Sequence, residues 1–260
     1  MAQIVPDATL PVNSTVTQQG ATTAIDGGTK AGGNLFHSFR EFSIPTNGEA
    51  YFNNALDIQN IFSRVTGGSI SNIDGLIRAN GSANLFLLNP NGIIFGPNAR
   101  LNIGGSFLAS TASSIRFADD TFFGTTSPQT APLLTISVPI GLQMGRNPGN
   151  ILVQGPGNNL SLNPETGTIT RDNRPVGLQV APGQTLALLG GNLTLEGGNL
   201  TAKSGRIELG SVGGDTLVTL TPMNSGMALS YPEMQNFQDI SLSKAASVDV
   251  SGAGGGDVFV

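Results

Sequence analysis

A short repeat between residues 191 and 209 constrains the fold more than any other feature of the sequence. Gly191-Asn192-Leu193-Thr194 recurs as Gly198-Asn199-Leu200-Thr201, and a looser copy follows as Gly205-Arg206-Ile207-Glu208, each seven residues after the last. Seven residues hold a strand of about four residues, each rising ~3.3 Å, and a corner of about three. Three such units close one coil of about 21 residues, so this spacing predicts the stacked coils of a parallel β-helix.

Residues 69–112 follow the same rhythm in slightly longer units, punctuated by Asn, Gly and Pro. The expected strands are Gly75–Arg78, Asn84–Leu88, Gly92–Phe95, Ala99–Ile103 and Ser106–Ser110. The runs Leu85–Leu88 and Ile93–Phe95 are apolar throughout instead of alternating, which is typical of strands buried on both faces. We therefore expect an extra strand or loop to cover the outer face of these strands.

The N-terminal segment has a different character, because four phenylalanines, Phe36, Phe39, Phe42 and Phe52, gather near its end. A stack of coils has an exposed first edge that must be covered. Residues 2–55 are therefore interpreted as an N-terminal cap over the first coil. Ordinary core packing of these phenylalanines is the alternative, and it does not exclude the first.

The chain 1–260 is interpreted as a single domain in which residues 56–260 form the coils. Two stretches rich in Pro, Gly, Asn and Thr, near 125–132 and 155–182, are expected to leave the stack as excursions and return to it. A new strand begins at the last residues without a polar capping segment behind it. Since repeat folds need terminal caps, we expect the natural chain to be longer.

Composition excludes several classes of function. The net charge of −5 argues against non-specific binding to nucleic acid. No window of eighteen apolar residues occurs, so no stable insertion into a membrane is expected. Cys is absent, so no disulfide can form. The first residues lack the charged and apolar regions of a signal peptide, and Ala2 fits the start of a mature chain. The expected product is a β-rich monomer.

Candidate catalytic and metal-binding residues are sparse. His37 is the only histidine, so a metal site or a Ser-His pair would depend on it alone, and a structural hydrogen bond is the preferred interpretation. Asp119-Asp120 is the only adjacent carboxylate pair, and it is typical of a solvated turn. Paired carboxylates can hydrolyse glycosides, which keeps a carbohydrate-active module as an alternative. No enzyme activity, catalytic residue, metal or cofactor is expected.

With these residues in view, the chain resembles the secretion domain of two-partner secretion exoproteins, the N-terminal domain of the filamentous-haemagglutinin type. The sequences of the motifs resemble those of the cyanobacterial branch of this family. The matching blocks are Asn34-Leu35-Phe36-His37-Ser38-Phe39, Phe52-Asn53-Asn54, Ser69-Ile70-Ser71-Asn72-Ile73-Asp74-Gly75, Asn84-Leu85-Phe86-Leu87-Leu88-Asn89-Pro90-Asn91-Gly92-Ile93-Ile94-Phe95-Gly96 and Gly105-Ser106-Phe107-Leu108-Ala109-Ser110-Thr111.

This resemblance implies a right-handed parallel β-helix in an all-β chain. It also implies that the domain addresses a large exoprotein to a partner β-barrel in the outer membrane, whose periplasmic POTRA domains bind it before translocation. The product would be secreted or held at the cell surface. An adhesive or carbohydrate-active β-helix module is the alternative, and a gene for a barrel transporter beside a long repetitive continuation would separate the two.

The secretion motif implied by the resemblance is Asn89-Pro90-Asn91-Gly92-Ile93. Its first four residues suit a type I turn at every position. A structural corner is the preferred interpretation, and direct recognition of an exposed turn by the transporter is the alternative. The second family hallmark, Asn-Pro-Asn-Leu, corresponds here to Ile58-Gln59-Asn60-Ile61, in which only Asn60 and an aliphatic residue match.

Overall fold

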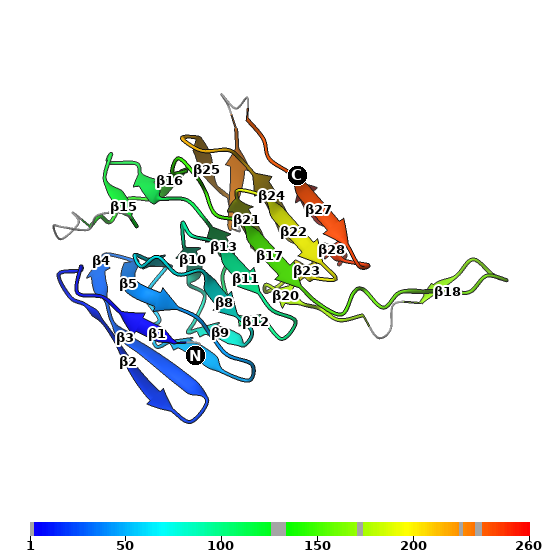
Figure 1. The fold of residues 1–260 in the computed structure, drawn as a ribbon, viewed down its shortest axis with the longest axis horizontal. Coiled ribbons are helices and arrows are strands. Elements are labelled where there is room, and N and C mark those ends of the chain that lie inside the picture. The colour runs from blue at the N-terminus through cyan, green and yellow to red at the C-terminus, as the bar shows by residue number, and fades with distance from the viewer. Residues whose placement is uncertain (1–2, 126–133, 171–173, 224–225, 232–235) are drawn as a thin grey trace.

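A computed structural model describes residues 3–125, 134–170, 174–223, 226–231 and 236–260. Every regular element in these ranges is a β-strand, so the chain is all-β (Figure 1). None of the described residues forms a helix that would be long and apolar enough to cross a membrane.

Sheet 1, the longest, carries seven strands in parallel register from one end of the molecule to the other. They are β5 (Asn34–Phe42), β7 (Asn60–Val65), β10 (Asn84–Leu88), β13 (Phe107–Ser110), β21 (Thr185–Gly190), β24 (Arg206–Ser211) and β29 (Asp257–Phe259). β1 (Ile4–Pro6) and β4 (Thr29–Ala31) pair antiparallel with β5 and so cover the edge of the first parallel strand.

Two further walls consist mainly of parallel strands. Sheet 2 contains β8 (Ser71–Ile73), β11 (Ile93–Phe95), β17 (Ile151–Gln154), β22 (Leu193–Glu196) and β27 (Ile240–Ser243). Sheet 3 contains the antiparallel hairpin of β2 (Ser14–Gln19) and β3 (Thr22–Gly27), followed by β6 (Glu49–Phe52), β9 (Leu76–Ala79) and β12 (Arg100–Asn102). Sheet 4, which lies beside β12, contains β20 (Leu178–Gln179), β23 (Asn199–Thr201) and β28 (Ser247–Asp249).

From β7 onwards the chain visits these walls in the same order, from sheet 1 to sheet 2 and then to sheet 3 or 4. We call one such circuit a pass. Thr185 of β21 pairs with Arg206 of β24, 21 residues later, which matches the spacing expected from the seven-residue repeat. The five strands expected between residues 75 and 110 are confirmed to within two residues at each end, because their Asn, Gly and Pro punctuation marks the corners.

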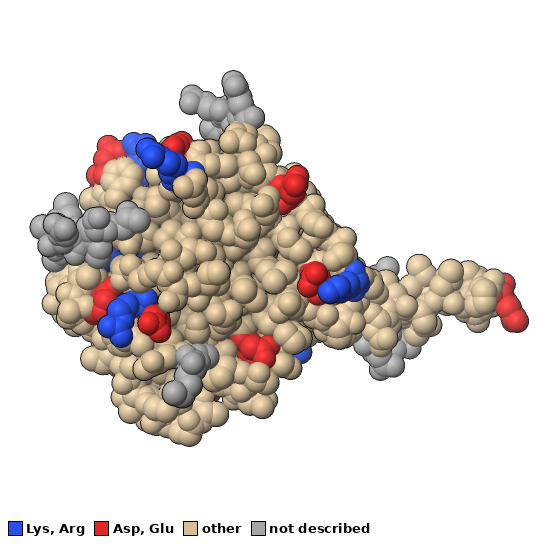
Figure 2. Space-filling view, viewed as in Figure 1, with Lys and Arg blue, Asp and Glu red and all other residues tan. Residues whose placement is uncertain are grey.

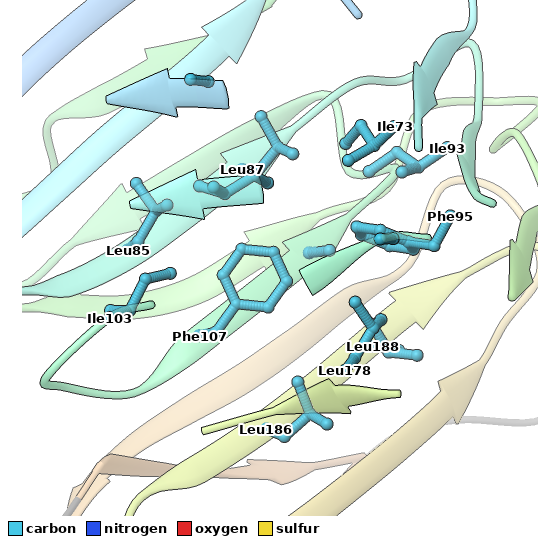
Figure 3. Packing of buried hydrophobic residues seen from close by; sticks show 14 of the residues in the cluster. Ile73, Leu85, Leu87, Ile93, Phe95, Ile103, Phe107, Leu178, Leu186 and Leu188 are labelled. Atoms are coloured by element: carbon cyan, nitrogen blue, oxygen red, sulfur yellow. The ribbon is translucent and has the colours of Figure 1, made fainter. Parts of the chain in front are cut away.

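The inner core fills the space enclosed by the parallel walls (Figure 3). Leu85 and Leu87 of β10 point inward with Phe107, Leu186 and Leu188 of the next two strands, and all five are at most 1% exposed. Burying each side chain of this size stabilises the fold by about 1.5–3 kcal/mol. The alternation of inward-facing apolar residues along each strand thus determines which side chains pack together between successive passes.

A second core lies on the outer face of sheet 1. An antiparallel cover sheet is formed there by β14 (Ser114–Phe117), β15 (Phe122–Gly124), β16 (Pro139–Gln143), β25 (Leu217–Met223) and β26 (Gly226–Ser230). Phe86 and Leu88 of β10 face this sheet and are buried against it. The cover expected over Leu85–Leu88 is therefore present, as a whole sheet built from segments far apart in sequence.

The N-terminal phenylalanines are core residues, which was the alternative left open by the sequence. Phe39, Phe42 and Phe52 belong to the inner core, whereas Phe36 belongs to the core under the cover sheet. β5 and β6 already pair in parallel with later strands, so the parallel ladders begin inside residues 2–55.

The two expected excursions differ in what the structure describes. Residues 126–132 of the first lie outside the described residues. In the second, β18 (Ser161–Leu162) and β19 (Ile169–Thr170) form a hairpin that reaches away from the body of the molecule (Figure 1). Near the end of this stretch, β20 rejoins the parallel sheets by pairing with β23.

Candidate functional site

The corner at Asn89–Gly92 connects β10 of sheet 1 to β11 of sheet 2. The Gly92 N–H donates to the Asn89 carbonyl oxygen over 3.2 Å, which closes the four-residue turn expected from the sequence. The Asn89 side-chain oxygen accepts the Asn91 N–H at 3.0 Å, an additional local bond typical of Asn at this position. Gly92 has φ +128°, a conformation that residues with a Cβ rarely adopt.

The same corner is bonded to the preceding pass through its two asparagine amides. Asn89 Nδ2 donates to the Ser69 carbonyl at 3.0 Å and to Ser71 Oγ at 2.9 Å. Asn91 Nδ2 donates to the Gly67 carbonyl at 2.7 Å. These bonds fix the loop between β7 and β8 against the corner, so the asparagine side chains join neighbouring passes.

The following pass closes over the other side of the corner. The Gly149 N–H donates to the Pro90 carbonyl at 3.0 Å, and the Ile93 N–H donates to the Asn150 carbonyl at 3.1 Å. A Cβ at Gly149 would lie 2.4 Å from the Asn91 carbonyl carbon, so no larger residue fits without movement. Ile93 itself is fully buried in the inner core.

The alternative interpretation, direct recognition by the transporter, needs an exposed turn, but Asn89 and Gly92 are buried. Asn89 is 0% exposed and Gly92 is buried, while Pro90 and Asn91 are half-buried. The physical reason is that the turn lies between two other passes, a context that local turn chemistry does not reveal. In the folded domain, a partner cannot reach the Asn89 side chain.

Asn60 belongs to a ladder of three asparagines that head successive strands of sheet 1. Asn60 Nδ2 donates to Asn34 Oδ1, and Asn84 Nδ2 donates to Asn60 Oδ1, each over 3.0 Å. The ladder continues where Asn84 Oδ1 accepts the Ser106 N–H at 2.9 Å. The amides therefore hold the strands in register, a role that we did not infer from the sequence.

A signal for this ladder is present in the sequence. Each asparagine is followed by Leu or Ile and then by Phe: Asn34-Leu35-Phe36, Asn60-Ile61-Phe62 and Asn84-Leu85-Phe86. The three phenylalanines stack beside the amides, with ring centroids 5.2 Å apart for Phe36 and Phe62 and 4.7 Å apart for Phe62 and Phe86. This triplet repeat, at intervals of one pass, would have identified both the asparagine ladder and the row of phenylalanine rings beside it.

Arg64 is the largest fully buried polar side chain in the described ranges, and the sequence reasoning missed it. Its guanidinium donates to Ser38 Oγ at 2.8 Å, to Thr9 Oγ1 at 3.0 Å and to the Gly124 carbonyl. It also lies 4.4 Å from the centroid of the Phe123 ring. Arg64 thereby joins the N-terminal segment, sheet 1 and the cover sheet.

The half-buried Asp7 completes this cluster. Its carboxylate accepts hydrogen bonds from Thr9 Oγ1, Ser38 Oγ at 2.8 Å and Thr66 Oγ1 at 2.6 Å. Burial alone would raise the pKa of Asp7, but the hydrogen bonds from Thr66, Thr9 and Ser38 hold it below its ordinary value. Burial lowers the pKa of Arg64 to about 10, partly opposed by the Asp7 charge, so Arg64 remains protonated at neutral pH.

His37 has the structural role expected from the sequence. Its Nδ1 lies 3.0 Å from Ser14 Oγ, which also accepts the Ser38 N–H at 3.2 Å. Burial lowers the pKa of His37 to about 3, so the ring is neutral at physiological pH. Ser14 and His37 are 4% and 1% exposed, so substrate has no access to this pair.

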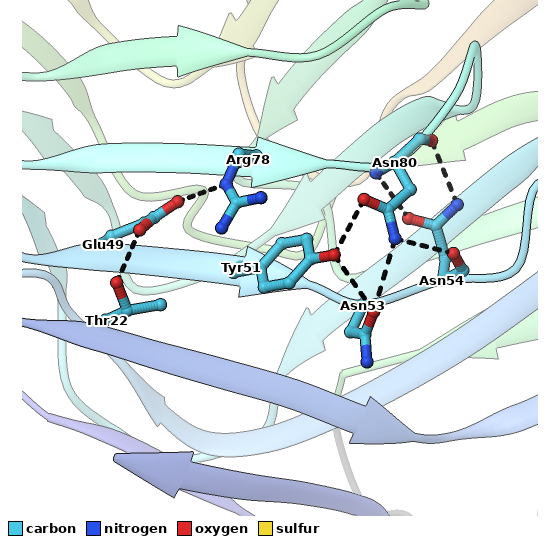
Figure 4. Close-up of polar contacts among 7 residues, drawn as sticks. All are labelled: Thr22, Glu49, Tyr51, Asn53, Asn54, Arg78 and Asn80. Carbon is cyan, nitrogen blue, oxygen red and sulfur yellow. Dashed lines mark hydrogen bonds and ion pairs between the residues drawn. The ribbon is translucent and has the colours of Figure 1, made fainter. Parts of the chain in front are cut away.

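A network of polar side chains lies on sheet 3 (Figure 4). Glu49 accepts hydrogen bonds from Thr22 Oγ1 at 2.6 Å and from Arg78, whose guanidinium lies 3.6 Å from the Tyr51 ring centroid. The Tyr51 hydroxyl lies 2.9 Å from Asn80 Oδ1. These side chains contact one another across β3, β6 and β9, and their hydrogen bonds stabilise the sheet.

The Asp119–Asp120 pair lies in the solvated turn between β14 and β15, as expected. Hydrogen bonds from the Thr135 and Thr121 hydroxyls lower the pKa of Asp119 to about 2. Asp120 forms an ion pair with Arg116 at 2.6 Å. A general acid in glycoside hydrolysis needs a raised pKa, so Asp119 is unsuited to the general-acid role in that chemistry.

Within the described ranges, no three His, Asp or Glu side chains come close enough to hold a metal ion. On the face shown in Figure 2, the basic and acidic side chains are scattered and both signs occur together. Among the described residues, polar groups instead gather where they bond one another, in the interior at Asn89 and Arg64 and on sheet 3 at Glu49 and Arg78. Their common arrangement joins successive passes and the sheet that covers them.

Comparison with known proteins relates this architecture to bacterial secretion domains. The chain is 34% identical to the heme/hemopexin-binding protein of Haemophilus influenzae over 113 residues, which cover 44% of this chain and 11% of that protein. It resembles the HMW1 secretion domain of the same organism with a TM-score of 0.56 and 20% identity, covering 96% of this chain and 56% of that one. It matches the filamentous hemagglutinin secretion domain with a TM-score of 0.43 and 14% identity, over 95% and 99% of the two chains.

The likeness to the HMW1 domain supports the fold, because nearly the whole chain superposes despite low identity. The aligned part spans only a fraction of the curated relative, so the comparison concerns this domain alone. The family model for the TPS secretion domain matches residues 2–260, a range that includes every residue of the structure's described ranges. This chain belongs to the TPS secretion domain family.

Proposed function

We propose that this domain addresses an exoprotein to a partner outer-membrane β-barrel transporter through that transporter's POTRA domains. The exoprotein would pass through the periplasm and the outer membrane to be secreted or held at the cell surface. The match of residues 2–260 to the TPS secretion domain carries this proposal. A cyanobacterial origin, suggested by the phrasing of the motifs, stays a prediction.

The parallel walls support the proposal that the chain winds as a right-handed β-solenoid. From β7 onwards the sheets are visited in the same order, and equivalent residues pair at intervals of one pass, as Thr185 does with Arg206. In this view residues 56–260 supply most of the coils and residues 2–55 include the cap. β1, β4 and the β2–β3 hairpin suit a capping role because they pair antiparallel at the first edges.

We further propose that Asn89, Pro90, Asn91, Gly92 and Ile93 serve secretion through the fold instead of through contact with the transporter. The burial of Asn89 and its bonds to Ser69 and Ser71 support this role. Asn60 would contribute in the same way, as the middle member of the asparagine ladder. Loss of either set of bonds would leave buried polar groups unpaired in the stack.

The domain is proposed to meet the transporter as a monomer and before it has folded. A strand such as β10 or β11 then offers unpaired N–H and C=O groups that can add to the sheet edge of a POTRA domain. Most pairings in the native structure join residues far apart in sequence, which makes folding slow. Outside the cell, stacking from the N-terminal end would nucleate the remaining passes and prevent return.

The proposed function predicts export that depends on the partner barrel. Residues 1–260, placed behind a cleavable signal peptide and ahead of a reporter domain, should reach the medium only when the cognate barrel is present. A barrel without its POTRA domains should leave the fusion in the periplasm. Immunoblots of medium and periplasm measure this, and equal release in all three strains would contradict the proposal.

A further inference from the structure

A groove with a volume of about 350 Å³ runs beside the asparagine ladder, between the start of the sheet 1 strands and the cover sheet. This volume lies within the range of about 300–1,000 Å³ that is typical of ligand sites. One wall carries amides and the other is apolar, and no charged side chain is among the described residues that line it. Neither the corner at Asn89 nor the Arg64 cluster contributes to this groove.

The amide wall retains donors that the fold does not use. Each side-chain amide of Asn has two N–H groups. One N–H of Asn60 and one of Asn84 serve the ladder, and neither Nδ2 reaches a second acceptor among the described residues. Both side chains are half-buried, and Gln59 and Gln184 extend the same wall. The groove thus presents a row of neutral donors at intervals of one pass.

The first member of the ladder shows which kind of group these donors bind. Asn34 Nδ2 donates to the main-chain carbonyls of Thr135 and Ser137, each at 3.0 Å. Asn34 is 3% exposed beneath them. The segment Leu134–Val138 thus contacts the ladder through alternate carbonyl oxygens at one end of the groove. Asn60 and Asn84 repeat this amide one and two passes further along.

The apolar wall selects among neutral ligands. It contains Leu220, Met227 and the half-exposed side chains of Val138 and Met223. Methionines adapt their shape to apolar side chains of different sizes. The one aromatic ring of the lining, Phe86, is 1% exposed and cannot stack on a sugar. This surface suits an apolar side chain flanked by main-chain carbonyls.

We infer that this groove binds an extended, uncharged peptide segment of another protein, whose main-chain carbonyls accept the free amide N–H groups of Asn60 and Asn84 while its apolar side chains pack on Met223 and Met227. The groove exists only where the passes are stacked against the cover sheet. Peptide binding therefore requires the folded domain, and it is separate from recognition of the unfolded chain by a transporter.

The test uses a capped pentapeptide, Leu-Thr-Ile-Ser-Val, which copies residues 134–138. It is titrated into isotopically labelled folded domain, and the side-chain amide signals of the protein are followed by NMR. We expect saturable shifts at Asn60 and Asn84. Met223→Glu places a charge on the apolar wall and should weaken binding at least about tenfold, since a charge is costly to bury.

Leu162→Glu is the matched control, because Leu162 is also exposed but lies in the β18–β19 hairpin. It should bind the peptide as the parent does. The inference is overturned if no saturable shift occurs, or if both variants weaken binding equally. It is also overturned if maltotriose saturates the same amide signals while the peptide does not, because the groove would then bind sugar.

Discussion

Replacing Asn89 with alanine should lower the free energy of unfolding by about 3 kcal/mol, because several buried groups lose their partners at once. The Asn89 side chain bonds the Ser69 carbonyl, Ser71 Oγ and the Asn91 N–H, and water cannot replace it at 0% exposure. For a chain of this length the melting temperature should fall by roughly 6–12 °C. Thermal denaturation followed by circular dichroism measures the change.

Asn98→Ala is the control for this substitution, since Asn98 lies in the corner after β11 but is exposed. It should change stability by at most about 0.5 kcal/mol, as surface substitutions usually do.

Gly92→Val should destabilise the domain by about 1–3 kcal/mol through backbone strain at φ +128°. An Asn89→Ala variant that melts at the parental temperature yet is not exported would show that the transporter reads the corner directly.

Replacing Arg64 with methionine should have an effect of similar size, about 3 kcal/mol, because the buried Ser38 hydroxyl and the Gly124 carbonyl lose a charged donor. Methionine preserves much of the apolar volume, so the loss would report the guanidinium and its bonds to Ser38, Thr9 and Gly124. Denaturant unfolding measures the difference. The slope with denaturant should stay unchanged if both states remain as compact as in the parent.

Arg40→Met provides the matched control, because Arg40 is exposed on β5, two residues from Ser38. Its expected cost is at most about 0.5 kcal/mol. If the two substitutions cost the same, the cluster of Arg64 and Asp7 does not join the N-terminal segment to the sheets in the way that the contacts indicate.

Local patterns predicted much of this fold. The spacing of Gly191, Gly198 and Gly205 predicted passes of about 21 residues, and Thr185 pairs with Arg206 at that interval. The turn at Asn89–Gly92 was predictable because its bonds lie within four residues. The continuous apolar run Leu85–Leu88 likewise indicated that both faces of the strand are covered.

Contacts between distant segments were not predictable from the same patterns. The burial of Asn89 depends on Ser69 and Asn150, which belong to other passes. Arg64 bonds Thr9 and Gly124, more than fifty residues away on either side. The spacing of strands can be predicted from a single sequence. Predicting these contacts also requires the register between passes and the path of the cover sheet.

The proposed function depends most on engagement of the transporter by the domain before it folds. The direct measurement compares binding of isolated POTRA domains to native residues 1–260 and to the same chain unfolded in denaturant and freshly diluted. We expect tighter binding to the freshly diluted chain, with protection of β10 or β11 backbone amides against hydrogen exchange. Equal or tighter binding to the native domain, with the same interface protected, would contradict strand addition by an unfolded chain.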